Sequence, residues 1–99
     1  MLNSKQRAQL RGLANSLDAI FQVGKGGIND QLIRQVDETL EVRELIKIRV
    51  LETAGSTARE IAEEIAAAVG ADVVQVIGWV IVLYKRSKNN PKIVLVKKK

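Results

Sequence analysis

Histidine and cysteine are both absent from the 99-residue sequence. Without cysteine the chain has no thiol nucleophile, no disulfide framework and no thiolate zinc site. Without histidine it lacks the commonest general base and the commonest metal ligand of proteins. We therefore expect no metal and no cofactor.

Long apolar runs are also missing. The longest, residues 73–84, is interrupted by Gln75 and Gly78 and is shorter than the roughly 18 residues that a membrane span needs. The start of the chain shows no signal-peptide pattern, because its basic residues fall within an amphipathic helix. We expect one domain over residues 1–99, monomeric, cytoplasmic and without a membrane partner.

Aromatic residues are scarce, with one each of Phe21, Trp79 and Tyr84. A sheet that stacks several bases on aromatic rings, as in an RNA-recognition motif, is therefore not expected. Trp79 lies at a predicted turn, where its ring could stack on a base, although packing against the turn is the commoner role.

Known enzyme signatures do not fit. No Walker A motif is present, and the dinucleotide fingerprint matches only Gly24 and Gly26, with Asn29 in place of the third glycine. Carboxylate pairs one helical turn apart, Asp37 with Glu41 and Glu60 with Glu64, fall on predicted outer faces, which are typically solvated. We expect no catalytic residue and no enzyme.

Positive charge is concentrated at the end of the chain. The net charge is +5, yet residues before Lys85 hold nine basic against eleven acidic side chains, a net of −2. The seven remaining basic residues follow without an acid: Lys85, Arg86, Lys88, Lys92, Lys97, Lys98 and Lys99. This basic tail, about residues 86–99, favours a polyanionic partner; a tail that only aids solubility is the alternative.

Hydrophobic periodicity predicts an α/β (α+β) fold in the order α-β-α-β-α-β-β. The expected elements are a helix capped by Asn3 or Ser4 with Leu10, Leu13, Ala14 and Leu17 inward, a strand over 19–23, a helix over 30–42, a strand over 44–50, a helix capped by Ser56 or Thr57 and ended by Gly70, strands over 73–77 and 80–84, and a short extended addition over 93–96. Crossover helices join parallel strands and the last hairpin is antiparallel, so a mixed four-stranded sheet with helices on its apolar faces results. The strand order is not determined.

The stretch Gly24-Lys25-Gly26-Gly27 connects the first strand to the second helix. Glycines let the backbone approach a ligand closely, and the helix that follows directs free N–H groups and the positive end of its dipole at the loop, which favours a phosphate. Lys25 adds a full charge, while Asp30 weakens the field slightly. A plain strand-to-helix turn that needs glycine for its geometry is the alternative.

Two further basic elements lack interspersed acids. They are the first helix, with Lys5, Arg7 and Arg11, and the end of the last strand, with Lys85, Arg86 and Lys88. The acids gather on the outer faces of the second and third helices instead. Such sidedness is expected of a protein that presents one face to phosphates.

Several segments, in order and at matching spacing, resemble those of a known family: residues 6–14 (QRAQLRGLA), 23–28 (VGKGGI), 44–48 (ELIKI), 74–78 (VQVIG) and 82–85 (VLYK). They resemble the CRM domain, named after chloroplast RNA splicing and ribosome maturation, and among its members the small stand-alone YhbY-like proteins of prokaryotes. Trp79 stands where the family is often basic, Lys85 where arginine is usual, and Val96 where proline is customary.

The resemblance implies an RNA-binding domain related in fold to the C-terminal domain of translation initiation factor three. It also implies that the Gly-x-x-Gly loop contacts RNA and that the protein associates with precursors of the large ribosomal subunit. We therefore expect a non-enzymatic protein that binds ribosomal RNA through Gly24, Lys25, Gly26, Gly27 and the basic side chains named above. A protein-interaction module whose basic tail docks on an acidic partner is the alternative.

Overall fold

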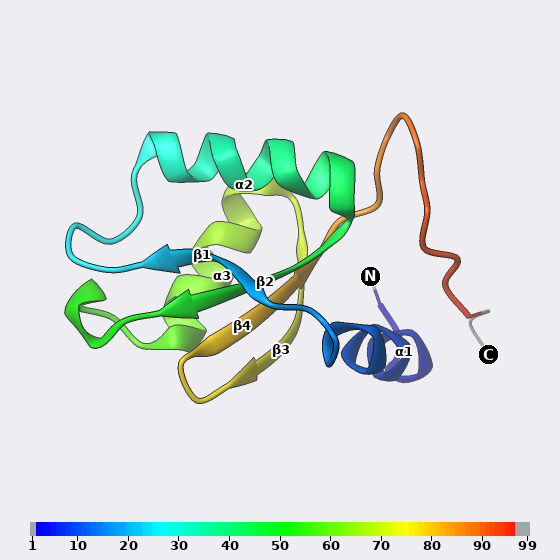
Figure 1. The fold of residues 1–99 in the computed structure, drawn as a ribbon, viewed down its shortest axis with the longest axis horizontal. Helices are drawn as coiled ribbons and strands as arrows, with labels where there is room; N and C mark the ends of the chain where they lie inside the picture. Colours follow the sequence, from blue (N-terminus) through cyan, green and yellow to red (C-terminus); the bar gives the residue numbers. More distant parts are fainter. Residues whose placement is uncertain (1, 97–99) are drawn as a thin grey trace.

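A computed structural model describes residues 2–96 and contains three α-helices and a four-stranded sheet (Figure 1). The elements are α1 (Ser4–Ala14), β1 (Ala19–Val23), α2 (Asp30–Arg43), β2 (Leu45–Val50), a short 3₁₀ helix η1 (Glu52–Ala54), α3 (Ala58–Val69), β3 (Asp72–Ile77) and β4 (Val80–Tyr84). The predicted fold class and element order are confirmed. The last three lysines of the predicted basic tail lie outside the described residues.

The sheet has the strand order β1-β2-β4-β3. β1 and β2 are parallel, while β4 is antiparallel to both of its neighbours. This arrangement confirms the predicted mixed sheet and places β2 and β4 at its centre. β1 and β3 are the edges.

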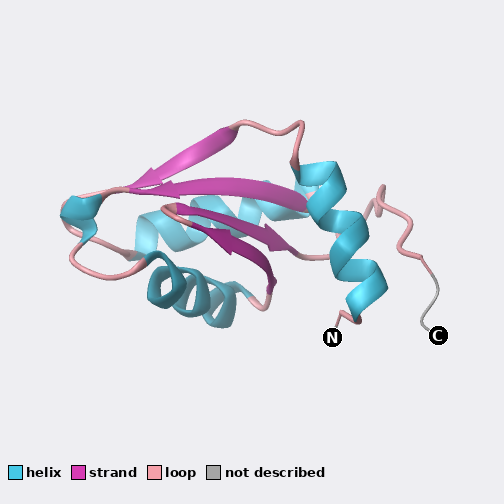
Figure 2. Cartoon of the chain, turned by 90° about the horizontal axis from the view of Figure 1, so that it is seen from below, coloured by secondary structure: helices cyan, strands magenta, loops and turns pink. Residues whose placement is uncertain are grey.

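Two separate hydrophobic clusters hold the helices to the sheet. The larger cluster lies between the sheet and the pair α2 and α3, with Leu40, Ile48, Ile65, Ile81 and Leu83 completely buried. The smaller one lies on the opposite face, under α1, and contains Leu2, Leu10, Ala14, Leu45, Val74, Val82 and Tyr84. Figure 2 shows α1 crossing the sheet near one end, whereas the other two helices run along it.

Local capping explains where the helices begin and end. Asn3 and Gln6 form a reciprocal capping box at the start of α1. Thr57, one of the two predicted caps, forms another with Glu60 at the start of α3. Gly70, with φ of 74°, ends α3 in the left-handed conformation that glycine adopts without strain.

Leu13 and Glu44 differ from the prediction. Leu13 was expected in the core but is 44% exposed, because α1 rests on the sheet through Gln6, Leu10 and Ala14, a spacing of four that leaves Leu13 to the side. Glu44 was expected to begin the second strand. It has instead a φ of 65° and is completely buried.

Glu44 and Glu41 hold the segment after β4 against the end of α2. Glu44 carboxylate oxygens accept the backbone N–H groups of Ser87 (2.8 Å), Lys92 (2.6 Å) and Ile93 (2.8 Å). Glu41 accepts the Ser87 hydroxyl at 2.7 Å and the N–H groups of Lys88 and Asn89 at 3.0 and 3.1 Å. We call residues 87–96 the C-terminal strap.

The C-terminal strap continues to α1. The side-chain amides of Gln6 and Gln9 bond the backbone of Val94 and Val96 at 2.8–2.9 Å, and Ile93 and Leu95 pack against the smaller cluster. Residues 93–96, expected as an extended addition, thus form no strand of the sheet and lie against α1. Most of the predicted basic tail is therefore bound to the domain.

We expect Glu44→Gln to destabilise the fold by about 1–3 kcal/mol, since a buried donor left without an acceptor costs that much. The amide oxygen can still accept two N–H groups, but the NH₂ group would face another donor. Urea denaturation measures the change. Glu38→Gln, on the exposed side of α2, is the matched control and should shift stability by less than about 0.5 kcal/mol. Equal values for the two variants would contradict this role of Glu44.

Candidate nucleic-acid interface

The loop Gly24-Lys25-Gly26-Gly27, here called the GKGG loop, leads from the end of β1 toward α2. Its backbone turns through a hydrogen bond from the Gly27 N–H to the Gly24 carbonyl, 2.9 Å long. Gly26 and Gly27 have φ values of 97° and 62°, which residues other than glycine rarely adopt. A Cβ on Gly26 would meet no atom within 4 Å. The loop therefore presents open backbone to solvent at Gly26.

Close packing, and not backbone conformation, favours glycine at position 24. A Cβ at this position would lie 3.2 Å from the Cδ1 atom of Leu51 and 3.5 Å from the Oγ1 atom of Thr53. The loop is thus packed against the segment that follows β2. This contact fixes one side of the loop and leaves Lys25 exposed on the other.

A polar hollow of about 310 Å³ lies beside the GKGG loop and the first turns of α2. Its lining carries no carboxylate and consists of Gln22, Gly24, Lys25, Gly27, Asn29, Gln31, Leu32 and Gln35. The Asn29 side chain caps α2 by accepting the Leu32 N–H at 2.8 Å. Asp30 is the acid of the first turn, so the helix end is capped and partly neutralised, and Lys25 supplies the loop's full positive charge.

The basic residues of α1 differ in how free they are. Lys5 is exposed and Arg11 is half-buried. The Nη1 atom of Arg7 donates to the backbone carbonyl of Val73, so this guanidinium also ties α1 to the edge strand β3. The first helix therefore keeps its predicted basic side, with one member engaged in packing.

The basic residues after β4 are arranged around α2. The Nζ atom of Lys85 lies 2.9 Å from the Oδ1 atom of Asp37, in an ion pair with the second helix. Arg86 and Lys88 are exposed at the start of the C-terminal strap. Asp37 is exposed, as expected of the outer face of α2, and it pairs with Lys85. Glu41 is half-buried, because it binds the C-terminal strap.

Hydrogen bonding shifts the pKa of both glutamates that hold the C-terminal strap. The N–H of Lys88, with the hydroxyl of Ser87 and the N–H of Asn89, lowers the pKa of Glu41 from 4.5 to about 2. Burial by itself raises the pKa of Glu44. The N–H groups of Ser87, Ile93 and Lys92 and the charge of Arg86 outweigh burial, so the pKa of Glu44 is lowered as well.

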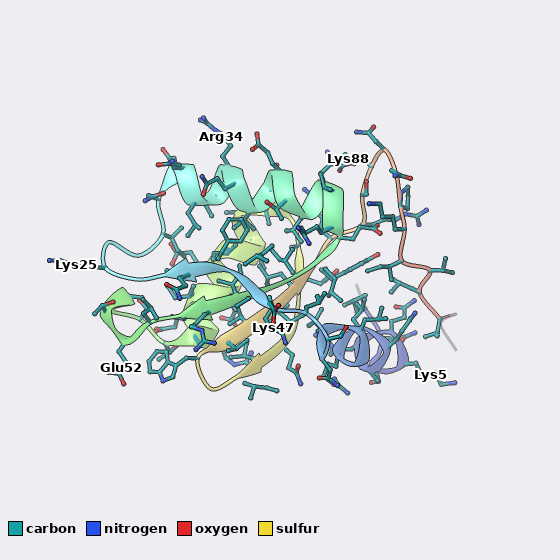
Figure 3. All side chains as sticks on the ribbon, in the orientation of Figure 1. Lys5, Lys25, Arg34, Lys47, Glu52 and Lys88 are labelled. Carbon is teal, nitrogen blue, oxygen red and sulfur yellow. The ribbon has the colours of Figure 1, made fainter. Side chains whose placement is uncertain are left out.

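The predicted basic elements lie at two ends of the molecule. In Figure 3, Lys25 is at the loop end and Lys5 is at the far end, with Lys47 of β2 on the sheet between them. Residues 45–50 alternate, so Lys47 and Arg49 share the α1 side of the sheet. Neither residue was among the predicted site residues, although Lys47 lies in the segment 44–48 that resembles the CRM domain.

No three His, Cys, Asp or Glu side chains within residues 2–96 group closely enough to hold a metal ion. Over the same residues, no helix has both the length and the apolar character to cross a bilayer. The chemistry that the described surface offers is that of lysine, arginine, amide side chains and open backbone.

Comparison with known proteins gives consistent matches. The profile of the CRS1 / YhbY (CRM) domain matches residues 2–85. The "Probable RNA-binding protein YqeI" of Bacillus subtilis is 48% identical over 95 residues, which are 96% of this chain and 99% of the relative. An "RNA-binding protein" of Haemophilus influenzae is 33% identical over 88% of both chains. The solution structure of a Staphylococcus aureus protein superposes with a TM-score of 0.77 at 47% identity, covering 97% of this chain and 100% of that one.

We expect acid to release the C-terminal strap. A carboxylate with a lowered folded pKa contributes stability that is complete above its ordinary pKa of 4.5 and is lost as the pH falls through the folded value, about 2 for Glu41. Amide chemical shifts of Lys88 and Asn89, followed by NMR, should therefore titrate well below pH 4.5, with far-UV circular dichroism recording any unfolding. A midpoint at or above pH 4.5 in folded protein would rule out the proposed role of Glu41.

Proposed function

Because the chain belongs to the CRS1 / YhbY (CRM) domain family, we propose that it is a non-enzymatic RNA-binding protein. The observation that carries the proposal is the GKGG loop, which offers open backbone at Gly26 and a free lysine at the end of β1. The names of the Bacillus and Haemophilus relatives support RNA as the partner.

The GKGG loop acts on the RNA backbone in this proposal. Phosphate oxygens lie against the loop backbone at Gly26, where glycine leaves it accessible, and the Lys25 ammonium supplies the charge. Contacts of this kind fix the position of the strand without reading its sequence. Lys5 and Arg11 on α1, together with Arg86 after β4 and Lys88 on the C-terminal strap, add further basic positions for a long RNA.

The RNA is ribosomal, as we propose, and belongs to precursors of the large subunit. This choice rests on the resemblance of residues 6–14, 23–28, 44–48, 74–78 and 82–85 to stand-alone YhbY-like proteins. Crosslinking in cells followed by sequencing of the bound RNA tests it directly. Enrichment of large-subunit ribosomal RNA is expected, and enrichment of unrelated transcripts alone would overturn this part of the proposal.

Docking of the basic tail on an acidic protein has less support. Glu41 and Glu44 already accept hydrogen bonds from five backbone N–H groups of the tail, those of Ser87, Lys88, Asn89, Lys92 and Ile93. This part of the tail would have to detach before it could wrap around a partner.

Gly26→Asp should weaken RNA binding by about 1–3 kcal/mol, the usual value of charge-assisted contacts, because it blocks the backbone and repels phosphate. Gly70→Asp is the matched control: Gly70 also has a positive φ with open space for a Cβ, but it ends α3 away from the loop. Lys25→Ala should cost less than Gly26→Asp. Fluorescence anisotropy with a labelled RNA gives the affinities, and circular dichroism verifies folding. Equal binding by folded Gly26→Asp and Gly70→Asp proteins would refute the role of the loop.

RNA affinity should fall steeply with salt. If about four to six phosphates of a single strand are engaged, log affinity against log salt should have a slope of about −3 to −4, since each phosphate contributes about −0.7. A titration at several potassium chloride concentrations measures the slope. A slope near zero would argue against an electrostatic binding mode.

A further inference from the structure

Within residues 2–96, no helix lies over one half of the sheet face on the α1 side (Figure 2). The smaller hydrophobic cluster ends at Val74, Val82 and Tyr84, and the strand ends nearer the GKGG loop continue beyond it. Cross-strand register places Gln22 beside Arg49, Arg49 beside Val80, and Val80 beside Ile77. We call the exposed or half-buried residues of this half the open sheet face: Ile20, Gln22, Lys47, Arg49, Gln75 and Ile77.

The open sheet face combines three kinds of side chain. Lys47 and Arg49 carry positive charge, and among the described ion pairs neither is bound to a carboxylate. Gln22 and Gln75 are amides, and Ile20 and Ile77 are apolar side chains that are 41% and 61% exposed. None of the six is acidic.

Two shallow hollows flank Lys47. One, of about 220 Å³, lies between Lys47, Gln75, Ile77 and the end of α1 at Asn15. The other, of about 260 Å³, lies between Lys47, Ile20, Arg43 and the acidic Asp18. The face therefore has relief on either side of a cation and is not a flat solvated sheet.

The open sheet face lies between the GKGG loop and α1. Gln22 is two residues before Gly24 and lies next to Arg49 in the sheet, while Lys47 lines one hollow together with Ala14 and Asn15 at the end of α1. The face thus connects the GKGG loop with the helix that carries Lys5 and Arg11. Figure 3 shows the same sequence of positions, from Lys25 through Lys47 to Lys5.

We propose that the open sheet face binds an unpaired segment of RNA, continuous with the strand whose phosphates contact the GKGG loop. The inference rests on the proposed function and assigns it a second surface. Phosphates contact Lys47 and Arg49, base edges meet the two glutamines, and the faces of unstacked bases cover Ile20 and Ile77. A duplex buries its base faces by stacking, so the apolar part of this surface fits a single strand.

Trp79 lies beside one corner of the open sheet face. It lies in the turn between β3 and β4, directly after Gly78 and next to Val80, and is 45% exposed. It is also the only tryptophan of the chain. Its fluorescence therefore reports on this end of the open sheet face without interference from other sites.

The test compares two double variants of equal charge. Lys47→Gln with Arg49→Gln removes two charges from the open sheet face, and the control, Arg34→Gln with Arg59→Gln, removes two from exposed positions on α2 and α3. For an unstructured RNA oligonucleotide, the first should lose about tenfold in affinity and reduce the salt slope by about 1.4, two single-strand phosphates. The control should stay within about threefold.

A second readout follows Trp79 emission during titration of the wild-type protein with the same oligonucleotide. Binding should quench the emission, and the Lys47/Arg49 double variant should show less quenching at saturation than the control. The proposal requires both results. Equal affinities of the two double variants overturn it, and so does binding that leaves Trp79 emission unchanged.

The outcomes separate this inference from the proposed function. Wild-type protein that binds no RNA overturns the proposed function together with the inference. Binding that depends on Gly26 but does not distinguish the two double variants overturns the inference alone. Polyglutamate that binds the open sheet face while the oligonucleotide does not would identify an acidic protein surface as the occupant, and would also overturn it.

Discussion

The buried residue Glu44 joins three parts of the chain at one point. Its backbone N–H donates to Leu40 at the end of α2, its carbonyl accepts the Lys85 N–H at the end of β4, and its side chain accepts three N–H groups of the C-terminal strap. A carboxylate with no exposed surface is stable only when its lone pairs are satisfied. The left-handed backbone of this residue makes the turn into β2 that brings these groups together.

This junction determines which half of the sheet is covered. The C-terminal strap, once fixed by Glu44 and Glu41, lays Ile93 and Leu95 on the smaller hydrophobic cluster and offers its backbone to Gln6 and Gln9 of α1. The strap and α1 therefore stabilise each other at the end of the sheet remote from the GKGG loop. The open sheet face, with Lys47 and Arg49 at its centre, lies at the opposite end of the sheet.

Features that depend on near neighbours in the chain could be predicted from the sequence. Periodicity located the three α-helices and the four strands, and the cap at Ser56 or Thr57 and the stop at Gly70 were predicted from residue type alone. The GKGG loop was recognised because positive φ requires glycine. The bonds of Glu44 to the C-terminal strap span 43 to 49 residues and end on backbone N–H groups, which no residue type reveals. The place of Lys47 and Arg49 on the open sheet face depends on the strand order, which the sequence does not determine. The ion pair of Lys85 with Asp37 likewise depends on how β4 and α2 pack.

The two ends of the described chain lie side by side. Val96 is hydrogen-bonded to Gln6 in the first turn of α1, and Figure 1 shows α1 and the C-terminal strap at the end of the molecule away from the GKGG loop. Copies of this domain joined head to tail would therefore need only short connections, and each would project its loop outward, away from the junctions. The architecture suits concatenation: a polypeptide built from several such units would present an array of separate loops to one long ligand, with the avidity that tethering provides.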